Sequence, residues 1–141
     1  MFSKACKYGI RAAIFIAVKT REGQKSGVVE ISDTLNVPKA FLAKILQKLV
    51  KADLISSTKG PYGGFYLSEE NMKKTVDHII TCIDGDDLFK GCVLGLPVCS
   101  ESNPCPLHEK VYPFREGIYY QMRHQTIADL AYDYDASQNR L

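Results

Sequence analysis

The sequence lacks the marks of a membrane protein, a secreted protein and an enzyme. Its first apolar stretch, residues 10–18, is interrupted by Arg11, is followed by no small-residue cleavage site, and is far too short to span a membrane. The chain also contains no phosphate-binding loop, no nucleophile with an adjacent base, no C-x-x-C pair and no internal repeat. We therefore expect a cytoplasmic protein that is not an enzyme and does not act at a membrane.

Acidic residues are scarce in the first part of the chain. Residues 1–60 contain eleven Lys and Arg against four Asp and Glu, a formal charge of +7, whereas the remainder carries −5. A basic half favours contact with a polyanion such as nucleic acid, although solvated surface lysines would give the same count. With 141 residues, of which 45% are hydrophobic, the chain is long enough to bury the core of one domain.

Residues 28–51 have the pattern of a helix-turn-helix. Residues 28–35 read as a short helix, Asn36 tolerates the left-handed backbone of a tight turn, and Pro38 suits the first position of a second helix. The second helix has one apolar stripe, formed by Leu42, Ile45, Leu46 and Leu49. Its opposite face is small and basic, which suits a recognition helix in the major groove of DNA, although an ordinary surface helix would also carry lysines.

A hairpin rich in Gly and Pro follows the second helix. Residues 54–68, LISSTKGPYGGFYLS, read as two short strands around a tight turn, with Lys59 near the tip. A helix-turn-helix followed at once by a hairpin is a winged helix, whose wing reaches a minor groove. We predict that the chain contacts double-stranded DNA through seven residues: Lys39, Ala40, Phe41, Lys44, Lys48, Lys59 and Tyr62.

Clustered cysteines are the second prominent feature of the sequence. Residues 92–108 read CVLGLPVCSESNPCPLH, three thiols and a final histidine in a stretch whose Gly, Pro and small polar residues are typical of a loop that can wrap an ion. In a chain without secretory features, clustered thiols indicate metal or redox chemistry and not a disulfide framework. Pro106 suits the first turn of a helix, which would place Cys105 near a helix N-terminus that lowers the pKa of its thiol.

Five segments of the chain together resemble a known family. They are KYGIRAAIFIA, ISDTLNVPKAFLAKILQKLVKADLISSTKGPYGGFYL, TVDHIITCIDG, the cysteine stretch and TIADL. In these segments the chain resembles the IscR/NsrR-type (Rrf-type) winged-helix transcription regulators of bacteria over nearly its whole length. The most specific element is the wing pattern KGPYGG, residues 59–64, in which Lys59 stands where the family often has arginine. The resemblance implies a homodimer that binds a palindromic operator.

The resemblance also implies a cofactor. Many family members hold an iron–sulfur cluster through three cysteines, which here would be Cys92, Cys99 and Cys105, and the state of the cluster alters DNA binding. His108 matches the fourth ligand of IscR-like members, whereas the acid that other members use is replaced here by Lys7. We expect a [2Fe-2S] cluster on this Cys3His set, in a regulator that senses cluster, redox or nitric oxide status.

The ligand types alone leave other assignments open. Three thiolates and one imidazole suit a zinc site as well as a cluster, and the thiols could instead form an oxidant-sensitive switch or be free cysteines in a surface loop. A thiol-dependent enzyme or cluster-transfer protein is the alternative from a different class, and it would leave the DNA-binding elements unexplained. Cys6 and Cys82 have apolar neighbours at helical spacing, so we interpret them as small core residues and not as ligands.

After the cysteines, apolar residues recur in steps close to a heptad: Leu107, Val111, Phe114, Ile118 and Met122. In the family the corresponding long helix pairs two subunits. Pro113 is awkward within a helix, so the helix either kinks there or begins there, with a separate turn carrying His108. Thr126 and Asp129 then have the spacing of a capping box at the start of a last helix.

The pattern as a whole predicts a mainly α fold with a small β-hairpin wing, that is, a winged helix-turn-helix, plus a C-terminal dimerisation helix. We expect residues 1–70 to form the DNA-binding region. Residues 71–141 would then contain the cysteine-bearing sensor loop and the dimerisation helices.

Overall fold

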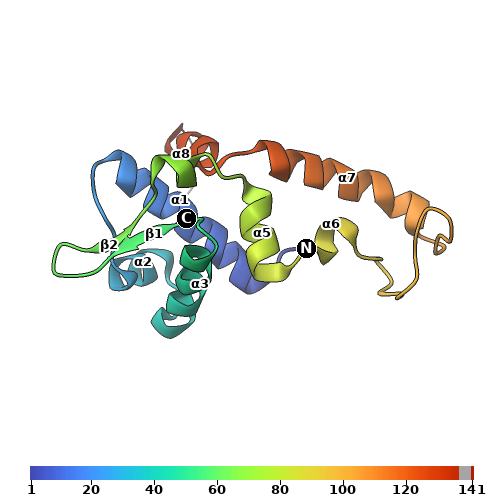
Figure 1. The fold of residues 1–141 in the computed structure, drawn as a ribbon, viewed down its shortest axis with the longest axis horizontal. Coiled ribbons are helices and arrows are strands. Elements are labelled where there is room, and N and C mark those ends of the chain that lie inside the picture. The colour runs from blue at the N-terminus through green and yellow to red at the C-terminus, as the bar shows by residue number, and fades with distance from the viewer. Residues whose placement is uncertain (137–140) are drawn as a thin grey trace.

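A computed structural model describes residues 1–136 and 141 of the chain. Its elements are α1 (Lys4–Arg21), α2 (Val28–Leu35), α3 (Lys39–Lys51), β1 (Ser56–Thr58), β2 (Gly64–Tyr66), α4 (Glu69–Met72), α5 (Val76–Asp84), α6 (Asp87–Lys90), α7 (His108–His124) and α8 (Ile127–Ala136). The fold is mainly helical with one antiparallel hairpin, as predicted, and Figure 1 shows that it is elongated. None of the helices in the described residues is long and apolar enough to cross a membrane.

Helix α1 lies at the centre of the main hydrophobic core. Its residues Ala12, Ala13 and Ala17 are fully buried. Because their side chains are small, the neighbouring helices can pack closely against α1. At Gly9 the approach is closest, since a Cβ atom there would lie 2.3 Å from Cδ1 of Ile83 in α5. The core also contains Ile127, so α8 packs on α1 although it follows α7 in the chain.

Helices α2 and α3 form the predicted helix-turn-helix. Asn36 ends α2 in the left-handed conformation, with φ 54° and ψ 51°, as expected for an asparagine in a tight turn. Arg11 of α1 donates to the Leu35 carbonyl over 2.9 Å, and the Ser32 hydroxyl donates to the Val37 carbonyl over 2.6 Å. Pro38 is the N-cap of α3, whereas the sequence pattern predicted it as the first residue inside the helix.

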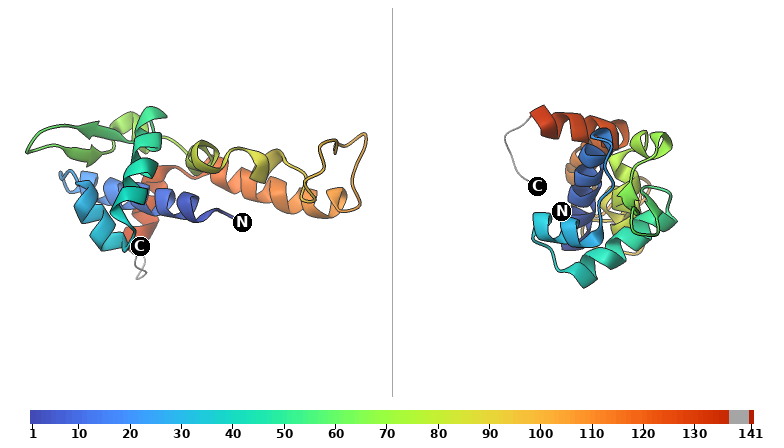
Figure 2. Two further views of the ribbon diagram at one scale, coloured as in Figure 1. Left: turned by 90° about the horizontal axis from the view of Figure 1, so that it is seen from below. Right: turned by 90° about the vertical axis from the view of Figure 1, so that its left-hand side faces the viewer.

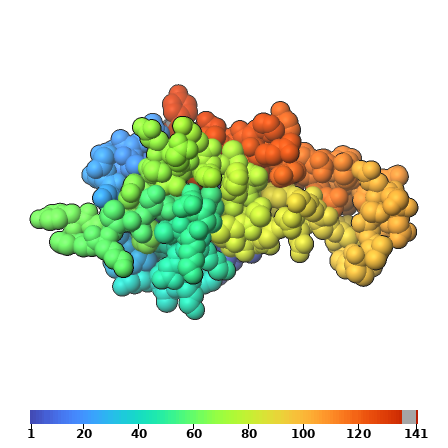
Figure 3. Space-filling model, viewed as in Figure 1, coloured from blue at the N-terminus to red at the C-terminus, as the bar shows by residue number. Residues whose placement is uncertain are grey.

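Strands β1 and β2 form the hairpin, and their register pairs Ser57 with Phe65. The backbone of Ser26, between α1 and α2, pairs with the other side of Phe65, at N–O distances of 2.7 and 3.0 Å. Gly64 allows this pairing, because its φ is 146° and a Cβ atom there would lie 3.0 Å from the Ser26 carbonyl oxygen. The hairpin is therefore anchored at its base and projects freely at its tip (Figure 3).

Helix α7 begins at the cysteine loop, residues 91–107, and runs back to the main core. The loop lies at the end of the molecule opposite the hairpin (Figures 1 and 2). It is continuous from His108 and contains Pro113 in its interior, so the expectation of a helix that begins at Pro113 is wrong. None of its residues is buried, all of them being described. Ile118 and Met122 pack against a second, smaller core, whereas the Phe114 side chain is 74% exposed.

Helix α8 begins at a capping box, as predicted. The Thr126 backbone N–H donates to the Asp129 carboxylate over 3.1 Å, and the Asp129 N–H donates to the Thr126 hydroxyl over 3.0 Å. The predicted second region, residues 71–141, includes residues 137–140, which lie outside the described part of the chain. Its boundary at residue 70 stays a prediction.

Candidate functional site

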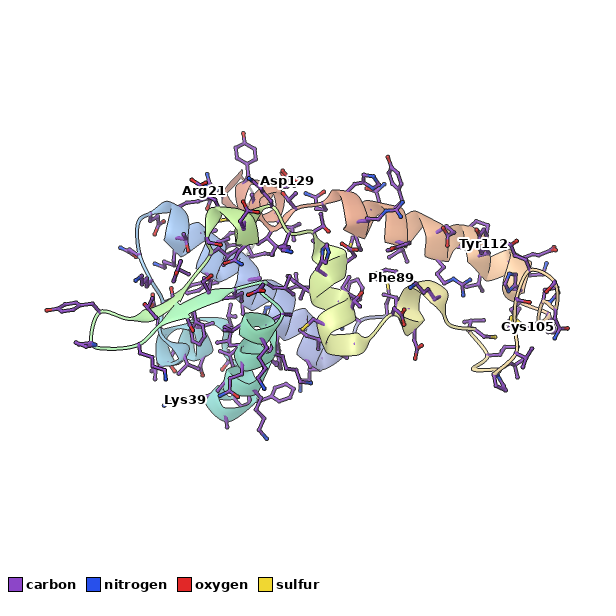
Figure 4. The ribbon with its side chains drawn as sticks, viewed as in Figure 1. Arg21, Lys39, Phe89, Cys105, Tyr112 and Asp129 are labelled. Carbon is purple, nitrogen blue, oxygen red and sulfur yellow. The ribbon has the colours of Figure 1, made fainter. Side chains whose placement is uncertain are left out.

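The seven predicted DNA contacts all lie at the surface. Lys39, Ala40 and Phe41 occupy the first turn of α3, Lys44 and Lys48 follow on the same helix, and every one of these side chains is exposed. Lys59 and Tyr62 lie in the loop of the hairpin, where Tyr62 is 93% exposed. In Figure 4, Lys39 lies at one end of the molecule and Cys105 at the other, so the candidate DNA interface and the cysteine loop are well separated.

The start of α3 is supported by α1, which lies outside the interface predicted from the sequence. The ring of Phe41 packs edge-to-face on Tyr8, with centroids 5.8 Å apart. Two cations flank the Tyr8 ring, Lys4 with Nζ at 6.0 Å and Arg11 with Cζ at 5.7 Å from its centroid. The i, i+4 and i+3 spacing of these residues along α1 is a signal that could have identified this group.

A further lysine supports the base of the hairpin. Lys25 precedes Ser26, and its ammonium donates to the Thr58 hydroxyl over 3.1 Å. The same ammonium lies 5.1 Å from the centroid of the Tyr66 ring. Lys25 thus adds a positive charge beside both strands, and no motif in the sequence indicates this contact.

The cysteine loop brings Cys92, Cys99 and Cys105 together. Their Sγ atoms all lie within 4.8 Å of one another, and those of Cys92 and Cys105 are 3.7 Å apart. Cys105 is buried, and the other two thiols are half-buried. A turn in which the Gly95 N–H donates to the Cys92 carbonyl over 2.9 Å folds the loop back, with Gly95 at a φ of 70°.

His108 is the first residue of α7 and approaches one of the three thiols. Its Nδ1 lies 3.2 Å from Cys99 Sγ, and its ring stacks on Tyr112 with centroids 6.0 Å apart. It lies outside the group whose ligand atoms are all within 4.8 Å of one another. The His108 N–H donates to the Cys105 carbonyl over 3.0 Å. Because Leu107 is the N-cap of α7, Pro106 precedes the helix and is not in its first turn as expected.

The pKa values of Cys92 and Cys99 are shifted in opposite directions by their surroundings in the loop. Backbone hydrogen bonds from Leu96 and Leu94, together with the hydrogen bonds shared with the Cys105 and Cys99 thiols, lower the pKa of Cys92 to about 7. For Cys99, a backbone hydrogen bond from Cys105 lowers the pKa, but burial and the two neighbouring thiols outweigh it, so the pKa is raised. Cys92 is therefore the first of the two to become the thiolate that a metal requires.

The donor set fits a metal of intermediate or soft character. A tetrahedral ion with metal–sulfur bonds of about 2.3 Å places its thiolates roughly 3.8 Å apart, and the Cys92–Cys105 separation is 3.7 Å. The Cys92–Cys105 pair therefore has the spacing of two ligands on one tetrahedral ion. A [2Fe-2S] cluster divides its ligands between two irons, so it needs the same donors spread more widely around the loop.

Two other cysteines lie outside this group. Cys6 is fully buried in the smaller core, as predicted for a small core residue. Cys82 is only half-buried, and its thiol donates to the Lys48 carbonyl of α3 over 3.6 Å. Burial raises the pKa of Cys82 in spite of the nearby Lys48 charge.

Residues 2–133 match the model of the Rrf2 family, which is described as an iron-dependent transcriptional regulator. The chain belongs to the Rrf2 family. This confirms the resemblance found in the sequence, and because Rrf2 proteins are transcriptional regulators, the chain is a regulator and not an enzyme.

Named relatives agree with this assignment. A protein of Aquifex aeolicus assigned to the HTH-type transcriptional regulators is 33% identical over 132 residues, which cover 92% of this chain and 90% of that protein. The HTH-type transcriptional regulator IscR of Yersinia pseudotuberculosis is 25% identical over 129 residues, covering 92% and 77% of the two chains.

Solved structures show the same fold. CymR of B. subtilis, described as a global cysteine regulator, has a TM-score of 0.73 and 23% identity, covering 94% of this chain and 97% of its own. T. potens IscR has a TM-score of 0.73 and 20% identity, covering 100% of this chain and 93% of its own. The winged-helix architecture of the Rrf2 chain is thereby confirmed.

Proposed function

We propose that this Rrf2 regulator acts in the cytoplasm as a homodimer that binds a palindromic operator, and that a group held by its cysteine loop controls this binding. The observation that carries the proposal is the convergence of three thiols, from positions spread over a loop, to within 4.8 Å of one another. The group is an iron–sulfur cluster of the [2Fe-2S] type, and the signal is cluster, redox or nitric oxide status.

The exposed α3 face and the hairpin support the DNA-binding part of the proposal. The first turn of α3 presents Lys39, Ala40 and Phe41, and a helix N-terminus of this kind reads base edges in a major groove. Lys44 and Lys48 would then meet phosphates, and Lys59 and Tyr62 would follow the neighbouring minor groove.

The surface of α7 supports the dimer. Phe114 is 74% exposed and Met1 is 81% exposed, and both lie beside Ile118 along one apolar groove. A monomer gains nothing from an exposed Phe on a helix without buried residues, whereas a second α7 packed on it would remove this apolar surface from water. The heptad-like spacing of the same residues agrees with helix pairing.

Cys92, Cys99 and Cys105 would hold the cluster, and His108 would supply the fourth, neutral ligand after a small rearrangement that turns it from Cys99 toward the metal. A bound cluster supplies one-electron redox chemistry and sensitivity to oxidants. The backbone N–H groups of Leu94 and Leu96 favour the ionised form of Cys92, on which binding of any such group depends.

A single zinc ion, or a switch made by the thiols alone, is the second candidate. It is favoured by the compact sulfur group, because a Cys92–Cys105 separation of 3.7 Å matches one tetrahedral ion. The family description as an iron-dependent regulator favours iron.

Anaerobic purification distinguishes the candidates. Wild-type protein should be coloured, with a visible absorption spectrum and iron and sulfide in equal amounts, and Cys92→Ala, Cys99→Ala and Cys105→Ala should each be bleached. His108→Ala should keep a more labile cluster, and Cys82→Ala is the control that should keep the full colour. If wild-type protein is colourless and contains one zinc ion per chain, or no metal, the cluster assignment is wrong and the zinc site or the thiol switch takes its place.

A further inference from the structure

Arg115 projects from the middle of α7 toward the cysteine loop. Its Nη1 donates to the carbonyl oxygen of Gly91, and its Cζ lies 5.8 Å from the centroid of the Tyr112 ring. Its Nε is buried and has no hydrogen-bond partner among the residues that the structure describes. A buried guanidinium donor without an acceptor is costly, so its place beside the loop requires an explanation.

The Gly91 carbonyl is a sensitive point, because Cys92 follows it directly. The chain leaves α6 through a tight turn, in which a Cβ atom on Gly91 would lie 2.7 Å from the Asp87 carbonyl oxygen. The Gly91 N–H donates to that same oxygen over 2.8 Å. With its N–H bound to α6 and its carbonyl bound to Arg115, Gly91, the residue before Cys92, is held on both sides.

The other end of the loop is attached to the same helix. The His108 N–H, at the start of α7, donates to the Cys105 carbonyl over 3.0 Å. Figure 4 shows Cys105 and Tyr112 at the same end of the molecule. Helix α7 is therefore bonded to both ends of the loop that spaces these two sulfurs 3.7 Å apart, to Cys105 through the His108 N–H and to Gly91 through Arg115.

Arg115 and Cys92 also border one cavity of about 290 Å³, whose other walls include Leu88, Val111, Phe114 and Ile118. Most of this lining is apolar, and Asp87 adds one carboxylate to it. A Cys92 thiolate would bring negative charge to this cavity, and Arg115 brings a positive charge from α7.

We propose that Arg115 is the positioning residue of the cysteine site. It holds Cys92 at the distance from Cys105 that one metal centre requires, and it places a positive charge at the cavity that Cys92 borders. This inference rests on the proposed metal site. Arginine suits the task because it donates from a planar fork and keeps its charge when buried, whereas lysine has a single flexible ammonium.

Cobalt(II) titration of the full-length protein, reduced and free of air, tests the role directly. Arg115→Met should bind Co(II) about 10- to 100-fold more weakly, as is usual when an outer partner of a metal site is removed. Its thiolate-to-cobalt charge-transfer absorbance should fall by about a third, because Cys92 is the thiolate that loses its position. Arg115→Lys, which keeps the charge and most of the bulk, should recover part of the affinity and show that a loss is not a failure to fold.

Arg123 provides the matched control. It lies two turns farther along α7 with its Cζ 4.8 Å from the Tyr119 ring centroid, so Arg123→Met removes a comparable cation–π interaction. Arg123→Met should bind Co(II) like the wild type. If Arg115→Met also binds with wild-type affinity and absorbance, Arg115 has no positioning role and the metal site stands. If the wild type binds no Co(II), the metal site itself fails and the inference fails with it.

Discussion

Cys6 and Cys92 belong to one chain but lie in opposite electrostatic surroundings. Burial, then the negative charge of Asp84 and a hydrogen bond to it, raise the pKa of Cys6 from 9.0 to about 12. Backbone donors lower the pKa of Cys92 to about 7. Since the thiolate is the reactive and metal-binding form, Cys6 is an inert part of the core, and Cys92 is prepared for chemistry.

The raised pKa of Cys6 makes stability depend on pH in a defined window. Below about pH 9 the thiol is protonated in both folded and unfolded chains, so its full contribution is present. Between pH 9 and pH 12 only the unfolded chain releases the proton, so the free energy of unfolding falls as pH rises. Urea unfolding at pH 8 and pH 10 should show the advantage of wild type over Cys6→Ser shrinking by about 1 kcal/mol. A difference independent of pH would contradict this.

Single residues were predictable where the signal is local. Three cysteines within fourteen residues can reach one another through a short loop, so their spacing already indicated a group. The Arg115–Gly91 bond spans 24 residues, and the Tyr8–Phe41 pair joins two helices. Such pairs depend on how α1, α3, α6 and α7 pack, which spacing along the chain does not determine.

At the scale of elements, the helix-turn-helix was predictable, whereas α7 was predictable as a long helix but not in its continuity through Pro113. Helices α2 and α3 are bounded by residues with strong backbone preferences, Asn36 and Pro38, and their apolar stripes give the buried face. Pro113 suggested a break in α7, but the helix continues through it. Pro113 and Glu109, one turn before it, are both exposed, so water can solvate the carbonyl that proline leaves without a donor.

The recognition helix and the hairpin can be tested as separate elements. Lys44→Ala in α3 and Lys59→Ala in the hairpin should each weaken binding to a two-fold symmetric duplex, and each should reduce the slope of log K against log salt by about one, because one phosphate is no longer neutralised. Fluorescence anisotropy over a salt series measures both quantities. Lys73→Ala, an exposed lysine paired with Glu70 over 3.4 Å, is the control and should leave the slope unchanged. If both variants keep the wild-type slope of log K against log salt, α3 and the hairpin are not part of the DNA interface.

At the scale of the whole molecule, dimerisation is best tested at Phe114. Ile118 is also on the predicted seam, but it packs against the smaller core of its own chain, so a charge there would destabilise the monomer as well. Phe114 is 74% exposed. Phe114→Glu should therefore leave the fold and its helical circular dichroism intact while multi-angle light scattering gives the mass of a monomer. Tyr132→Glu on α8, at a position 66% exposed, should stay dimeric. A dimeric Phe114→Glu variant would place the interface elsewhere.

The far end of α7 is joined to the main core by backbone bonds. The Val76 N–H donates to the Gln125 carbonyl over 3.0 Å, and the Ile127 N–H donates to the Lys74 carbonyl over 2.9 Å. The helix between this junction and the cysteine loop has 17 residues, so it is about 26 Å long. A tilt of α7 by about 5° around this junction would move the cysteine loop, at the other end of the helix, by about 2 Å. Because α7 contacts α5 and α5 contacts α3, we expect a displacement of the cysteine loop to reach the recognition helix through α5.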